Sequence, residues 1–162
     1  MSNLAETLPS PAVPVRRRDP WTTILRIVVC AIGFRLLTAA LALLTNLVFP
    51  EFQPEQFTMF GDTSPFWDPF TRYDSGWYMG IARTGYQWAE GGRSNIAFFP
   101  VYPLLMRAAG RAMGTHIAQL YLGGIIVSWV NFVLAMVVLY KLARLDLPRL
   151  RAEKAVLLTA IF

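Results

Sequence analysis

The stretch ILRIVVCAIGFRLLTAALALLTNLV, residues 24–48, decides the fold class of this chain. As a helix it would be roughly 37 Å long, enough to cross a hydrocarbon core of about 30 Å with some tilt. It is too long for the core of a signal peptide, so we expect a retained membrane anchor. Trp21 and Phe49 flank it, where interfacial aromatic residues are common.

Two further apolar segments follow the first one. The second, residues 117–140, is again long enough to cross a membrane, and the 162-residue chain is 55% hydrophobic, against about 45–50% in soluble domains. The third, AVLLTAIF at residues 155–162, would be about 12 Å long as a helix, so we expect only the start of a span. The sequence therefore predicts an all-α integral membrane protein, of which this chain would be an N-terminal fragment.

The placement of charge predicts the orientation of the chain. Three arginines at residues 16–18 precede the first segment, and residues 141–154 carry five basic side chains. Residues 50–116 hold five arginines against six carboxylates, a net charge of −1. Basic flanks belong on the cytoplasmic side, so the N-terminus is expected inside and residues 50–116 outside. The expected units are a disordered cytoplasmic tail (1–20), a first transmembrane helix (21–49), an extracytoplasmic loop (50–116), a second transmembrane helix (117–140), a cytoplasmic loop (141–154) and the start of a third transmembrane helix (155–162).

Composition also argues against two classes of ligand. The net charge is +5, but the basic residues flank the apolar segments instead of forming one patch, which disfavours a nucleic-acid partner. His116 is the single histidine, and no acidic cluster has metal-ligand spacing, so we assign no metal. Arginine far outnumbers lysine, which is typical of GC-rich bacterial genomes and suggests a bacterial plasma membrane.

The outer loop carries one carboxylate in a pattern. Asp74 stands three, four and seven residues before Trp77, Tyr78 and Ile81, so the four share one face of a short helix that Gly85 would end. Asp74 could cap this helix, worth about 1 kcal/mol. Spacing alone favours this capping role over the alternative, a general base on the outer membrane surface. Asp68 and Asp62 are weaker candidates for the same role.

A proline-rich stretch follows, AFFPVYP at residues 97–103. Its two prolines exclude a regular helix, so we expect it to be extended or a turn. Residues 104–113 can then form a helix with Pro103 at its first position. Arg107 and Arg111 would share one face of that helix, the pattern of a helix lying in the membrane interface. Thr115 is the expected N-cap of the second span, in which Gly124, Ser128 and Asn131 favour close helix packing.

Arg35 falls near the middle of the first span. A mid-membrane arginine costs about 2.5–3.5 kcal/mol on insertion scales. Three arrangements reduce that cost: an ion pair with a carboxylate elsewhere, which we favour, a place near a lipid phosphate, or snorkelling of the side chain to the interface.

The outer loop resembles a known family. DSGWYMGIARTGY (74–86) followed by AFFPVYP (97–103) is similar to the second mannosyltransferase of GPI-anchor synthesis, the PIG-V family, and its bacterial relatives. The family pattern is an aspartate, an aromatic pair, IA-x-x-GY and then AFFP-x-[YF]-P. The likeness covers about thirty residues, and both halves occur in order between two predicted spans.

This resemblance implies a GT-C glycosyltransferase, a polytopic helical bundle with short interfacial helices in its first outer loop. Such an enzyme moves a sugar from a polyprenyl- or dolichyl-phosphate carrier to a glycan or lipid acceptor on the extracytoplasmic face. Its partners would be membrane lipids, this donor and this acceptor, with no other cofactor. The resemblance makes Asp74 the catalytic base. The expected substrate-binding residues are the cations Arg72, Arg93 and Arg107, near the lipid phosphate, and the aromatic residues Tyr78, Tyr86, Phe99 and Tyr102.

Two other interpretations remain open. A non-catalytic subunit of a membrane complex would need no specific carboxylate in its outer loop. A transporter fragment should show broken or polar helices at the membrane midplane, for which only Arg35 and Asn131 argue.

Overall fold

The computed structural model describes residues 20–49, 68–114 and 116–161, and all regular structure in these ranges is helical. The predicted all-α class is thereby confirmed. The elements are α1 (Pro20–Val48), the 3₁₀ helix η1 (Asp68–Phe70), α3 (Ser75–Thr84), α4 (Val101–Met113), α5 (Ile117–Asp146) and α6 (Arg149–Ile161).

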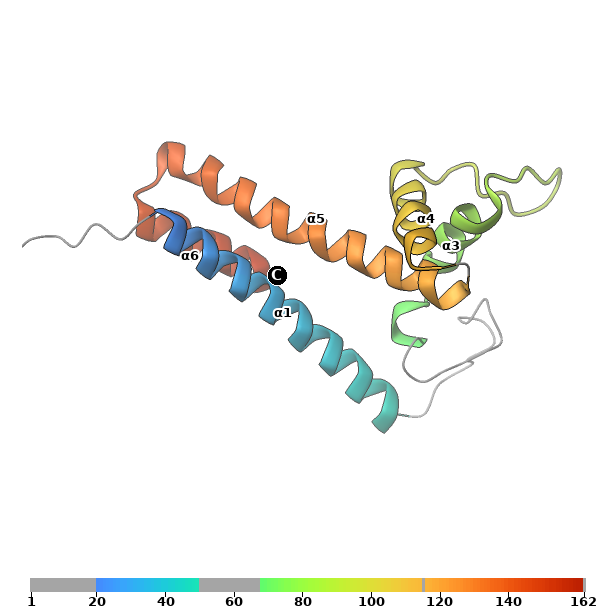
Figure 1. Cartoon of the computed structure of the whole chain (residues 1–162), viewed down its shortest axis with the longest axis horizontal. Coiled ribbons are helices and arrows are strands. Elements are labelled where there is room, and N and C mark those ends of the chain that lie inside the picture. Colours follow the sequence, from blue (N-terminus) through green and yellow to red (C-terminus); the bar gives the residue numbers. More distant parts are fainter. Residues whose placement is uncertain (1–19, 50–67, 115, 162) are drawn as a thin grey trace, which may run out of the picture.

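Two helices, α1 and α5, are long and apolar enough to cross a membrane. They run antiparallel as the long arms of the molecule, with α3 and α4 at one end and α6 beside α1 at the other (Figure 1). Only 11% of the most apolar stretch of α1 and 17% of that of α5 is buried within the chain. Most of the apolar surface of both helices is therefore not covered by the described part of this chain.

The end of the molecule that holds α6 is a three-helix contact. Arg26 of α1 forms an ion pair with the buried Glu153 of α6, with 3.0 Å between Nη1 and Oε1. Arg149, at the start of α6, donates hydrogen bonds to the hydroxyl of Thr23, which is also buried. These polar contacts fix α6 against α1. Beside them lies an apolar cluster of Ile27, Ala31, Met136, Tyr140, Ala152 and Val156.

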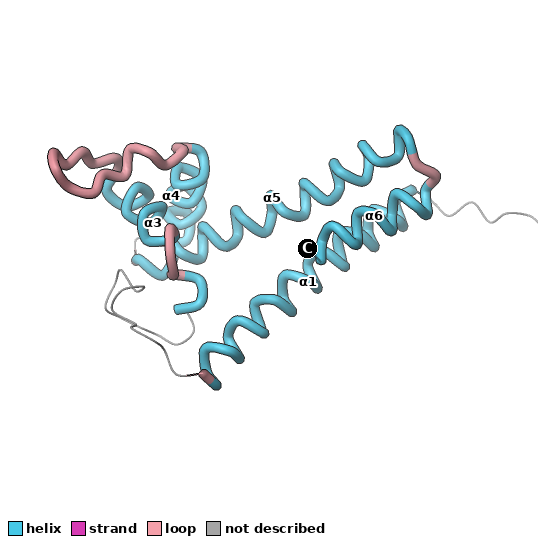
Figure 2. Tube along the Cα trace, turned by 180° about the vertical axis from the view of Figure 1, so that it is seen from behind, coloured by secondary structure: helices cyan, strands magenta, loops and turns pink. Residues whose placement is uncertain are grey.

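At the other end, α4 crosses α5 at very short range (Figure 2). A Cβ atom added to Gly123 of α5 would lie 2.5 Å from the backbone nitrogen of Gly110 in α4. Glycine at both positions lets the two backbones approach. The predicted packing role of Gly124 is also seen, since it is buried against Tyr102 and Met106. Ser128 and Asn131, in contrast, are exposed in this structure.

The structure corrects the predicted boundaries at the end of the molecule that holds α6. Helix α1 already includes Pro20, and α5 continues to Asp146, six residues beyond the expected end at 140. Helix α6 begins at Arg149, so most of the expected loop 141–154 is helical. Lysine, arginine and leucine are good helix formers, and the helix is interrupted only before Pro148, where Leu147 is extended.

Two further expectations differ at the end of the molecule that holds α3 and α4. Helix α4 begins at Val101, with Pro103 inside its first turn, so the stretch 97–103 is not wholly extended. The first N–H groups of a helix have no intrahelical partner, so a proline there removes no hydrogen bond. The N-cap of α5 is His116, whose N–H donates to Oε1 of Gln119, instead of Thr115, which lies outside the described residues. Residues 1–19 and 50–67 and Phe162 are outside them as well.

Candidate functional site

Asp74 occupies the N-cap position of α3, as the sequence predicts, but its side chain makes no capping hydrogen bond. The hydroxyl of Ser75 closes this turn instead, donating to the carbonyl oxygen of Arg72 at 2.7 Å. Tyr73 has φ of 55°, a left-handed conformation that is uncommon outside glycine. The chain therefore turns sharply just before Asp74, and the exposed carboxylate of Asp74 does not cap the helix.

Asp74 lines a cavity of about 340 Å³. The segment after η1 contributes Arg72, α3 contributes Tyr78, and α4 contributes Tyr102. Four of the residues predicted to act on substrate, Arg72, Asp74, Tyr78 and Tyr102, thus meet in one place. The wall is completed by Phe70, Ser75, Met106, Tyr121 and Ile125.

Arg72 gives this cavity a cationic group with a fixed position. Its Nη2 donates a hydrogen bond to Oδ1 of Asn46, near the end of α1, at 3.0 Å. The side chain is half-buried. A guanidinium beside a cavity favours an anion such as a phosphate, and Asp74 on the same wall is a proton acceptor.

The aromatic side of the cavity is tightly packed. The ring of Tyr78 meets the rings of Phe98 and Tyr102 edge-on, each with 5.1 Å between centroids. The hydroxyl of Tyr102 donates to the carbonyl oxygen of Gly124 at 3.2 Å. Burial, and secondarily the neighbouring Tyr78, raises the pKa of Tyr102, so this phenol stays neutral and keeps its hydrogen bond at physiological pH.

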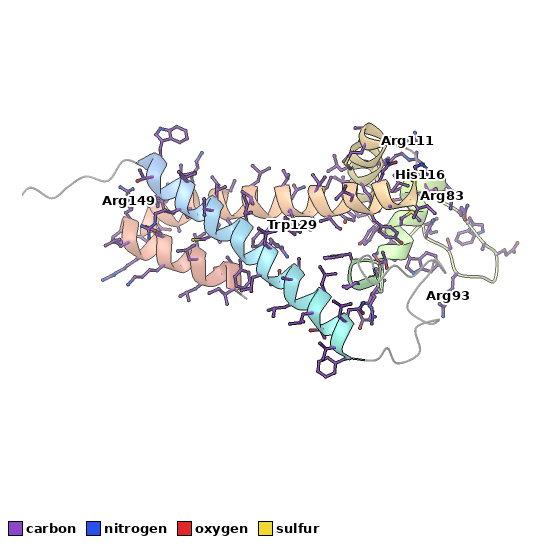
Figure 3. All side chains as sticks on the ribbon, turned by 60° about the horizontal axis from the view of Figure 1, so that its bottom comes forward. Arg83, Arg93, Arg111, His116, Trp129 and Arg149 are labelled. Carbon is purple, nitrogen blue, oxygen red and sulfur yellow. The ribbon has the colours of Figure 1, made fainter. Side chains whose placement is uncertain are left out.

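The other predicted binding residues do not line this cavity. Tyr86 donates its hydroxyl to the carbonyl oxygen of Phe98, and Phe99 is 74% exposed. Arg93 is exposed on the loop between α3 and α4 (Figure 3). Arg107 contacts backbone carbonyls at the end of α3. The alternative base Asp68 lies in η1, and Asp62 is outside the described residues.

A second, larger space lies between the two long helices. This groove of about 680 Å³ is lined by apolar side chains of α1 and α5, Trp129 among them (Figure 3). Phe70 and Ile125 line both spaces, so the apolar groove adjoins the polar cavity. The remaining groove residues are Ile32, Leu36, Ala39, Leu43, Leu122, Ile126, Val130, Val133 and Leu134.

Sequence reasoning missed the groove and half of the cavity wall. In the sequence, Leu36 or Ile126 is indistinguishable from any other apolar residue of a span. Tyr121 and Ile125 stand one turn apart on α5, which is their only local signal. Their part in the cavity depends on how α4 and α5 cross.

No protein-family model matches this chain, and comparisons with curated proteins and with solved structures also find no match. What this site does must therefore be inferred from its own residues.

Proposed function

We propose that this chain belongs to a multi-span membrane glycosyltransferase that takes a sugar, mannose by its motifs, from a polyprenyl-phosphate carrier at the extracytoplasmic face. The main support for the proposal is that the polar cavity around Asp74 adjoins the apolar groove between α1 and α5. A polyprenyl-phosphate sugar joins a long apolar chain to an anionic, hydroxyl-rich head. An apolar groove meeting a cavity that holds Arg72 and Asp74 matches both parts of such a molecule.

The cavity groups support a direct displacement. The carboxylate of Asp74 accepts the proton of the acceptor hydroxyl as its oxygen attacks the anomeric carbon. The bond between that carbon and the phosphate oxygen breaks, and the phosphate leaves with the bonding electron pair. Arg72 is the cation placed to stabilise the charge of the leaving phosphate. Tyr78 and Tyr102 provide an aromatic wall for the sugar.

The substitution Asp74→Asn tests this role. As a general base, Asp74 should be worth roughly 10²–10⁴-fold in turnover. Asparagine is about as good an N-cap as aspartate, and the side chain makes no capping bond here, so folding and membrane insertion should not change. The assay is transfer of radiolabelled mannose from polyprenyl-phosphate mannose in membranes that contain the protein.

Asp68→Asn is the comparison variant, because Asp68 in η1 is the alternative base that the sequence offers. We expect it to keep nearly full activity. Loss of activity in Asp68→Asn alone would move the base to Asp68. Full activity in both variants would rule out base catalysis by this loop and favour a non-catalytic membrane subunit.

A further inference from the structure

Arg35 continues a buried stripe of α1. Ile27, Ala31 and Arg35 are spaced four residues apart and so lie on one face of the helix. The first two are 1% exposed in the contact with α5 and α6. Arg35 stands one turn further toward the outer end, close to the middle of α1. The face of α1 that packs against α5 and α6 therefore ends at Arg35, a cation within an apolar helix.

The contacts of Arg35 satisfy its guanidinium only in part. The guanidinium carbon lies 3.9 Å from the ring centroid of Phe132 in α5, a cation–π contact. The Nε atom is buried and has no hydrogen-bond partner in the described part of the chain. A ring face attracts the positive charge, but it does not accept in-plane hydrogen bonds from the N–H groups. These donors form a planar fork that matches the two oxygens of a carboxylate.

The chain already pairs another arginine of α1 in this way. Arg26 is neutralised by Glu153 on the neighbouring helix α6. No similar group is present for Arg35 among the described residues, because α1 has no acidic residue and the one acidic residue of α5, Asp146, lies at its far end. Glu153 is itself occupied by Arg26.

We propose that Arg35 is the docking point for a partner membrane-spanning helix that carries one aspartate or glutamate at mid-membrane depth. Arg35 does not line the apolar groove between α1 and α5, so such a helix would pack on the apolar surface of α1 beside that groove, here called the seam, and Arg35 supplies the charge that selects it. A lipid headgroup fits less well, because α1 places Arg35 roughly 20 Å from either helix end, whereas lipid phosphates lie near the ends. The proposal requires α1 to span a membrane, but it does not depend on sugar transfer.

Synthetic helices can test this docking directly. We would reconstitute the whole chain in phosphatidylcholine vesicles and add a leucine–alanine peptide long enough to span them, with one central glutamate. Matched peptides carry glutamine, leucine or lysine at the same position. Binding is read by energy transfer from the labelled peptide to an acceptor dye at Ala89→Cys, in a Cys30→Ser background. Ala89 is exposed on the outer loop, away from the seam.

We expect the glutamate peptide to bind roughly tenfold more tightly than the leucine peptide, and the lysine peptide to bind least. Arg35→Leu should abolish the preference for glutamate, and Arg35→Lys should retain part of it. Arg111→Leu, which removes an exposed arginine outside the seam, is the control and should change nothing.

Two results would overturn the proposal. One is equal binding of the glutamate and leucine peptides to the unaltered protein. This comparison does not depend on whether any variant folds. The other is an undiminished glutamate preference in Arg35→Leu.

Discussion

Arg107 and Arg111 lie one turn apart on α4, yet their side chains have different environments. Nε of Arg107 donates to the carbonyl oxygen of Ala82 at 2.5 Å, and Nη2 donates to that of Arg83 at 3.3 Å. Arg111 is exposed. The final carbonyls of a helix have no partner within it, so Arg107 closes the end of α3 and ties it to α4.

The two arginines therefore form a matched pair for a stability test. Arg107→Ala should lower the free energy of unfolding by about 1.5–3 kcal/mol, since it leaves these carbonyls without a charged donor. Arg111→Ala should change it by less than about 0.5 kcal/mol. Thermal unfolding of both variants in the same detergent measures the difference. Equal effects would mean that Arg107 does not hold α3 and is free for another role.

Asp74 shows which structural features of a single residue can be predicted from sequence. Its position before the aromatic stripe, and the start of a helix after it, follow from spacing alone, and both are observed. Its hydrogen bonding does not follow, because Ser75 closes the turn and Tyr73 adopts a left-handed conformation. Such competition between neighbours depends on backbone angles that residue spacing does not specify. For the same reason, Arg107 could not be assigned to the end of α3 from its sequence pattern.

At the scale of elements, the crossing of α4 over α5 determines the shape of the cavity. Gly110 and Gly123 meet there, and an added Cβ on Gly123 would also lie 2.8 Å from the carbonyl oxygen of Met106. Backbone atoms cannot move aside as a side-chain end can. Any larger residue at this crossing must push the helices apart, and with them Tyr102 of α4 and Tyr121 of α5, which both line the cavity.

Gly123→Ala should therefore destabilise the protein by roughly 1–3 kcal/mol through overpacking. Gly33→Ala is the control within a long helix, because nothing lies within 4 Å of its added Cβ. It should be neutral or stabilising by up to about 1 kcal/mol, since alanine is the better helix former. Thermal unfolding of the two variants gives the comparison. A neutral Gly123→Ala would show that α4 and α5 do not cross this closely.

Element boundaries were less predictable than the elements themselves. The prolines of residues 100–103 were expected to delay α4, but a proline in a first turn removes no intrahelical bond. The basic residues after 140 were expected to form a loop, but their side chains are compatible with helix, and α5 continues to Asp146. The Gly110–Gly123 contact leaves no mark in the sequence, because its partners belong to different helices.

At the scale of the whole molecule, hydropathy predicts two long helices because the length of an apolar run reports a single element. The cavity and the groove are different, because each needs side chains from segments far apart in the chain. Phe70, for example, lines the groove together with Leu43 of α1 and Ile125 of α5. Whether these three residues line one groove depends on how α1 and α5 diverge toward the end that holds α3 and α4. No local sequence pattern predicts this divergence.

The arrangement of the helices gives a definite prediction for topology. Because α1 and α5 run antiparallel, residues 68–113 lie at one end of the molecule and the start of α6 at the other (Figure 1). Arg83, Arg111 and His116 are at the first end and Arg149 is at the second (Figure 3). The basic flanks predict that the end with α6 lies in the cytoplasm.

Cysteine labelling in intact cells checks this orientation. In a Cys30→Ser background, a membrane-impermeant maleimide should label Ala89→Cys from outside, and should label Arg151→Cys only after the membrane is opened. Both positions are exposed, so a difference in labelling reports their side of the membrane and not burial in the protein. Opening the membrane before labelling is the control that both cysteines can react. The reverse pattern would place Asp74 and its cavity on the cytoplasmic face, which is incompatible with the proposed transfer on the extracytoplasmic side.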